Sequence, residues 1–142
     1  MRDPVIATVA GGMSGVFVAN ATRFEGLNGL EGVATDRAGN VYFCLEHRVW
    51  LLNATTGLMA AVAGNGAVGF DGDGGPATSV ALGFPQGVAV DGGGNVLIAD
   101  TYNHRIWRVA AGTGVITTVA GTGVGGFSGD GGPGTSAALG FP

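Results

Sequence analysis

The sequence is poor in charged residues and contains no lysine. Only 11% of its 142 residues are charged, and its six basic residues are arginines scattered along the chain. A nucleic-acid-binding surface needs clustered basic charge, so we expect no nucleic-acid partner. No run of 18 apolar residues occurs, so we expect no membrane-spanning helix and no membrane insertion.

Cysteine is almost absent, because Cys44 is the only one. A single cysteine excludes an internal disulfide framework. Since Cys44 lies in an apolar stretch, we expect it to be buried as a small apolar residue. Residues 1–4 lack the apolar stretch and cleavage site of a signal peptide. We expect either a cytoplasmic chain or a targeting segment outside this sequence, so the compartment stays open.

Glycine and apolar residues are abundant instead. The chain has 30 glycines, and 46% of its residues are hydrophobic. Disordered chains show the opposite balance of apolar and charged residues. Glycines placed between apolar runs indicate short strands joined by tight turns, which predicts an all-β fold.

An internal repeat dominates the sequence. When residues 57–85 are aligned with residues 114–142, 19 of 29 positions are identical. The match continues upstream, where Gly32–Asp36 aligns with Gly87–Asp91, and a weaker copy begins at Thr8. A repeat of this period is the sequence signature of an architecture built from stacked units.

The second repeat predicts four short strands joined by three tight turns. Asp36 and Asp91 are expected to end the first turn of each repeat, and Trp50 and Trp107 to occupy equivalent third-strand positions in packing between units. Four-stranded units at this period are typical of β-propeller blades. The strands are expected at residues 87–91, 96–99, 106–109 and 116–120, after a leading strand at residues 5–10.

Residues 95–106 and the glycine-rich run from Gly112 resemble the signature of NHL repeats. The two Gly-Asp-Gly-Gly-Pro segments resemble the connectors of long NHL repeats, found in bacterial proteins and in the teneurin propeller. The resemblance implies four-stranded antiparallel blades of a β-propeller, usually six-bladed, that acts as a non-catalytic scaffold for binding proteins. The first repeat departs from the signature around Cys44–Arg48, where an aspartate and an asparagine are missing.

The resemblance divides the chain into a degenerate partial repeat at residues 1–29, a first blade at 30–83 and a second blade with a trailing connector at 84–142. Two blades cannot close a ring, and their apolar faces would stay open. Two explanations therefore remain. The chain is a piece of a longer propeller, or several copies assemble into a ring, for example three chains giving six blades.

The turn between the second and third strands supplies the expected binding residues. Exposed tyrosine and arginine are effective anchors for a protein partner. Tyr102 and Arg105 are therefore the predicted contacts, beside self-association through the open blade faces.

Alternating aspartates in the connector resemble the opening of a calcium loop. The later ligands of such a loop are missing, and the second copy has Ser128 in place of Asp71. We therefore predict no metal at Asp71, Asp73 or Asp130, and expect Asp73 and Asp130 to accept backbone N–H groups.

No set of residues with an evident catalytic arrangement occurs, so the sequence predicts neither an enzyme nor a cofactor. His47 and His104 occupy equivalent positions, and His104 is expected to bond to Asp100 and Asn103 across its turn. The alternative is a propeller enzyme of the lactonase or amidating-lyase type, with a metal at the ring axis. Glu31 precedes a first strand as such a ligand would, but Gln86 takes that place in the second blade.

Overall fold

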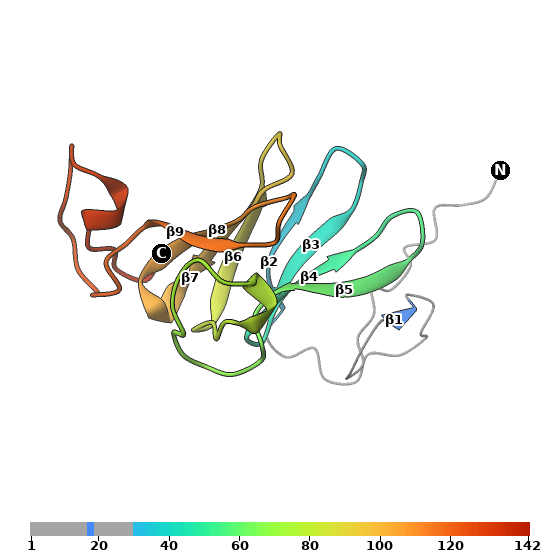
Figure 1. The fold of residues 1–142 in the computed structure, drawn as a ribbon, viewed down its shortest axis with the longest axis horizontal. Coiled ribbons are helices and arrows are strands. Elements are labelled where there is room, and N and C mark those ends of the chain that lie inside the picture. Colours follow the sequence, from blue (N-terminus) through green and yellow to red (C-terminus); the bar gives the residue numbers. More distant parts are fainter. Residues whose placement is uncertain (1–16, 19–29) are drawn as a thin grey trace.

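The structure is a computed structural model that describes residues 17–18 and 30–142. Within these ranges the chain is β-structure with three 3-10 turns, and its strands form two antiparallel sheets side by side (Figure 1). The predicted all-β class and four-stranded blades are confirmed. None of the described helices has the length and apolar character needed to cross a membrane.

The first sheet, blade 1, is a meander of four consecutive strands extended by a short fifth strand. Strand β1 (Phe17–Val18) pairs with Leu58 and Met59 on the outer edge of the meander. The predicted leading strand at residues 5–10 lies outside the described residues. The four meander strands are β2 (Leu30–Thr35), β3 (Val41–Leu45), β4 (Arg48–Leu52) and β5 (Leu58–Ala63).

The second sheet, blade 2, repeats the meander in the order β6-β7-β8-β9. All four predicted strands are present, with shifts of one or two residues at some ends. Between them, the 3-10 turn η2 (Thr101–Asn103) separates the second and third strands. The strands are β6 (Pro85–Val90), β7 (Val96–Asp100), β8 (Arg105–Val109) and β9 (Ile116–Ala120).

Each first turn is built around an aspartate, as predicted. The carboxylate of Asp91 accepts the N–H groups of Gly93 and Asn95, both at 2.9 Å, and the side-chain amide of Asn95 at 2.8 Å. Asp36 makes the same contacts with Ala38 and Asn40. These hydrogen bonds, led by those from the asparagine side chains, lower the pKa of both aspartates.

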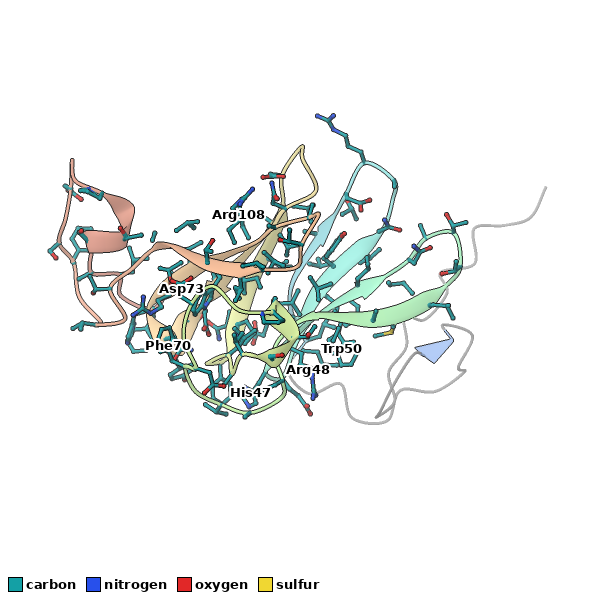
Figure 2. All side chains as sticks on the ribbon, viewed as in Figure 1. His47, Arg48, Trp50, Phe70, Asp73 and Arg108 are labelled. Carbon is teal, nitrogen blue, oxygen red and sulfur yellow. The ribbon has the colours of Figure 1, made fainter. Side chains whose placement is uncertain are left out.

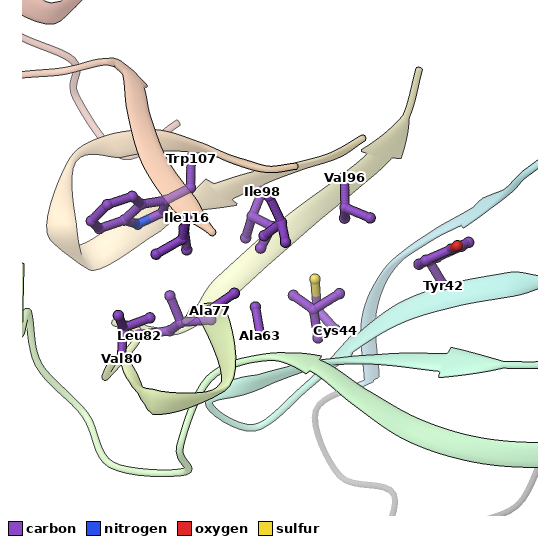
Figure 3. Packing of buried hydrophobic residues seen from close by; sticks show 12 residues of the cluster. Tyr42, Cys44, Ala63, Ala77, Val80, Leu82, Val96, Ile98, Trp107 and Ile116 are labelled. Atoms are coloured by element: carbon purple, nitrogen blue, oxygen red, sulfur yellow. The ribbon is translucent and has the colours of Figure 1, made fainter. Parts of the chain in front are cut away.

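The main core lies between the blades (Figure 3). Because side chains alternate along a strand, Tyr42 and Cys44 face blade 2, while Phe43 faces the opposite side of blade 1. Trp107 packs fully buried in the inter-blade core, as predicted, whereas Trp50 packs against the second cluster with Phe43 and Met59. Burying each large side chain stabilises the fold by about 1.5–3 kcal/mol.

Two connectors of similar sequence follow the blades. The first connector (residues 64–84) contains the 3-10 turn η1 (Ala77–Ser79) and leads into blade 2. The second connector (residues 121–142) follows β9 and contains η3 (Gly134–Ser136).

Candidate protein-binding surface

A row of aromatic rings runs across both blades. We call this set, His47, Phe84, Tyr102, Phe141 and His104, the aromatic row. Successive ring centroids in it lie 4.4, 4.9, 5.8 and 4.7 Å apart. Phe84, Tyr102 and Phe141 are exposed by 45%, 58% and 64%. Exposed rings in mutual contact form a continuous apolar surface rather than scattered single residues.

The backbone of the aromatic row is unusual. Phe84 and Phe141 have φ angles of 53° and 49°, and His104 has 51°. Such left-handed conformations are costly for residues with a Cβ and persist only where the surroundings enforce them. Phe84 and Phe141 occupy the same place in the repeated Leu-Gly-Phe-Pro segment. Both repeats therefore hold a phenylalanine at this surface in an unfavourable backbone conformation.

Hydrogen bonds tie the connectors to the turn that carries Tyr102. The N–H of Tyr102 donates to the carbonyl of Gly83 at 2.9 Å. The N–H of Phe141 donates to Nδ1 of His104 at 3.2 Å, and the hydroxyl of Thr101 donates to the carbonyl of Pro142 at 2.8 Å. The rings are thus held on an ordered backbone, which lowers the entropy lost when a partner binds.

Asp100 is the buried support under the aromatic row. Its carboxylate accepts the N–H of Gly83 at 2.6 Å, the indole Nε1–H of Trp107 at 2.8 Å and the amide of Asn103 at 2.7 Å. Burial raises the pKa of Asp100, although these hydrogen bonds oppose the rise. One carboxylate thereby joins the connector, the turn and the third strand of blade 2.

The two predicted contact residues have different environments. Tyr102 is exposed, as expected of a contact residue. Arg105 is only partly exposed, and its guanidinium donates to the carbonyls of Gly121 at 3.2 Å and Thr122 at 2.7 Å. The same group lies 4.4 Å from the ring centroid of Phe70. Arg105 thus contacts both connectors. That Tyr102 and Arg105 bind a partner stays a prediction.

The predicted partners of His104 are wrong. Asp100 and Asn103 bond to each other, while His104 accepts the N–H of Phe141. The reason is that His104 ends η2 in a left-handed conformation and its ring lies against Phe141 of the second connector, whereas Asp100 bonds to the buried indole of Trp107. In blade 1, Nδ1 of His47 is buried without a hydrogen-bond partner, and its ring meets the ring of Phe84 edge to face.

Two of the three connector aspartates, Asp71 and Asp73, bond to the backbone. Asp73 accepts the N–H of Thr118 at 2.9 and 3.0 Å, which confirms the expectation for this residue. Asp71 accepts the N–H of Ala81 at 2.9 Å, and Asp130 is exposed. Glu31, the residue on which the enzyme alternative rests, is exposed in β2. Across residues 17–18 and 30–142, no three His, Cys, Asp or Glu side chains cluster in a way that could hold a metal.

Cys44 is fully buried, as predicted, and burial raises its thiol pKa to about 12. Cys44 is therefore a packing residue in the described fold rather than a reactive thiol.

Comparison with known proteins supports the architecture. Residues 82–109 match the family model of the NHL repeat. A solved protein of unknown function from Bacteroides thetaiotaomicron matches 73% of this chain with a TM-score of 0.62 and 22% identity. The chain spans 26% of that protein's length, and this likeness speaks for the fold alone. No curated protein matches. The family match and the four-stranded meander together identify the segment at residues 82–109 as an NHL repeat within a propeller-type fold.

Proposed function

We propose that this chain is a non-catalytic binding module and that the aromatic row contacts a protein partner. The observation that carries the proposal is the ordered, exposed contact between Phe84, Tyr102 and Phe141. Tyrosine and other aromatic side chains supply most of the binding energy in many protein interfaces. Because the row is continuous and projects from both blades, it suits an extended peptide segment with apolar side chains.

The polar residues of the described fold support a non-catalytic role. Asp36 and Asp91 hold turns, Asp73 holds a connector, and Asp100 holds the base of the aromatic row. These carboxylates are engaged in structural hydrogen bonds, and in the part of the chain that the structure describes they form no cluster of three acidic, histidine or cysteine side chains. The proposal therefore assigns the chain to binding rather than to catalysis.

Selection from a phage-displayed peptide library on the immobilised chain tests this function. We expect selected peptides to contain apolar anchors and to lose about 30-fold in affinity with the variant Tyr102→Ala, as for a binding hot spot of about 2 kcal/mol. Val68→Ala is the matched control, because Val68 is 58% exposed, as Tyr102 is, and lies outside the aromatic row. Failure to select any peptide, or equal binding by wild type and Tyr102→Ala, would refute the proposal. Circular dichroism confirms that each variant folds.

A further inference from the structure

The first connector docks on the outer strand of blade 2. The N–H of Gly74 donates to the carbonyl of Ile116 at 2.8 Å, and the N–H of Ile116 donates to the carbonyl of Gly75 at 3.0 Å. Beside them, the carboxylate of Asp73 accepts the N–H of Thr118. This segment therefore covers the hydrogen-bonding edge that β9 would otherwise expose.

Apolar contacts complete the docking. Phe70 stacks on Trp107 with ring centroids 5.6 Å apart and an interplanar angle of 22°. The guanidinium of Arg105 also lies over the ring of Phe70, 4.4 Å from its centroid. Beyond it, Val80, Ala81 and Leu82 are only 6%, 3% and 0% exposed. Figure 2 shows Phe70 and Asp73 on the side of the first connector that meets blade 2.

The second connector has the same internal structure without this docking. The N–H of Thr122 donates to Ala137 as that of Asn65 donates to Val80, and Gly121 donates to Gly134 as Gly64 donates to Ala77. The contact residues of this connector are nevertheless exposed. Phe127, the counterpart of Phe70, is 94% exposed against 45% for Phe70, and Asp130, the counterpart of Asp73, is exposed.

We propose that the second connector is a docking segment for a further β-blade of this repeat type. The required partner has an unpaired outer-strand edge and, on its third strand, an arginine and a tryptophan two positions apart. When the second connector docks on this partner blade, Phe127 would stack on the partner's tryptophan, and Asp130 would accept an N–H of the partner's outer strand. The inference rests on the established interface between the first connector and blade 2, which has this chemistry in Arg105, Trp107 and β9.

A second copy of this chain is a poorer partner than a separate blade. Blade 1 does have Arg48 and Trp50 at the equivalent positions. However, β1 already pairs with Leu58 and Met59, which are the counterparts of Val115 and Ile116. The second connector would have to displace β1 in order to dock there.

The direct test supplies a further blade. A copy of residues 86–142 is appended to the full chain, since Pro142 already occupies the place of Pro85 in the repeat, and the variant Phe127→Cys is labelled with a thiol reagent. Because Cys44 is buried, the introduced thiol is the one that reacts in the folded protein. We expect labelling at least tenfold slower in the extended chain than in the original chain. Phe70→Cys is the matched control, with slow labelling in both chains. Equally fast labelling of the Phe127→Cys variant in both chains overturns the proposal.

Urea unfolding gives a second readout. In the extended chain, Phe127→Ala should lower the unfolding midpoint as much as Phe70→Ala does in the original chain, while Phe127→Ala leaves the original chain unchanged. Val124→Ala is a control at another exposed residue of the same connector. Light scattering of the original chain examines self-association. A discrete oligomer that Phe127→Ala dissociates would assign the docking to a second copy and overturn the separate-blade proposal.

Discussion

Replacing Asp100 with alanine removes the acceptor that holds together the first connector, η2 and β8. The N–H of Gly83 and the indole N–H of Trp107 are buried, so both lose their partner in the variant. Each buried donor left unsatisfied costs about 1–3 kcal/mol. Asn103 keeps its second hydrogen bond, to the carbonyl of Gly69 at 2.6 Å, so its loss is smaller.

The expected net loss is about 3 kcal/mol in the free energy of unfolding, because removing a desolvated carboxylate recovers part of the cost of the two orphaned donors. Urea unfolding followed by tryptophan fluorescence at neutral pH measures it. Asp91→Ala is the matched control, since water can replace its exposed hydrogen bonds. If Asp100→Ala is no more destabilising than Asp91→Ala, the buried network does not have the role assigned to it here.

The same residue makes stability depend on pH. Since burial raises the folded-state pKa of Asp100 above 3.8, the folded protein binds its proton more tightly than the unfolded chain does. The part of the stability that is linked to protonation of Asp100 is fully present below pH 3.8 and is lost as the pH rises through the folded-state pKa, in addition to the hydrogen-bond contribution measured above at neutral pH. Asp100→Asn should abolish this component. Unfolding midpoints measured from acid to neutral pH test it, and parallel profiles for wild type and Asp100→Asn would contradict it.

Three further predictions concern single residues of the repeats. Gly64 has a φ of 90°, and a Cβ there would collide with the carbonyl oxygen of His47. Gly64→Ala should therefore lower the free energy of unfolding in urea by about 2–3 kcal/mol, and by more than Gly72→Ala, because a Cβ at Gly72 meets open space. Cys44, with a pKa of about 12, should resist a disulfide reagent in the folded protein and react in urea, and rapid reaction without urea would be inconsistent with its burial. Asp91 should titrate by NMR below 3.8, so that its contribution to stability is present above that pH and is lost as the pH falls through its folded-state pKa. A measured Asp91 pKa at or above 3.8 would show that the hydrogen bond from Asn95 does not stabilise the ionised carboxylate.

Much of the fold was predictable because a blade is built from local pairings. Strands of alternating apolar residues and turns headed by Asp36 and Asp91 follow from short segments of sequence, and each strand pairs with the next along the chain. The backbone-bonding role of Asp73 also follows from its glycine-rich surroundings. Its partner Thr118 could not be foreseen, because the two residues are 45 positions apart and meet only through the docking of the connector.

The candidate surface was predicted in part. The sequence predicts Tyr102 as an exposed contact residue of a turn, but it does not predict Phe84 or Phe141 as part of the same surface. The repeated Leu-Gly-Phe-Pro segment shows that both phenylalanines belong to the repeat, but a residue before proline is ordinarily extended, so their left-handed backbone does not follow from the sequence. Only the positive φ angles and ring contacts reveal that these residues extend the surface around Tyr102.

The sequence by itself determined the repeat unit, its four strands and its turns, because these depend on neighbouring residues along the chain. The tertiary structure decided which of two equivalent residues in the repeats is buried by a neighbouring unit. Trp107 and Trp50 occupy equivalent positions, yet they pack in different clusters, and Phe70 stacks on Trp107 while Phe127 is exposed. Equivalent positions of the two repeats acquire different environments because burial depends on which blade lies alongside, and that arrangement arises only when the units stack.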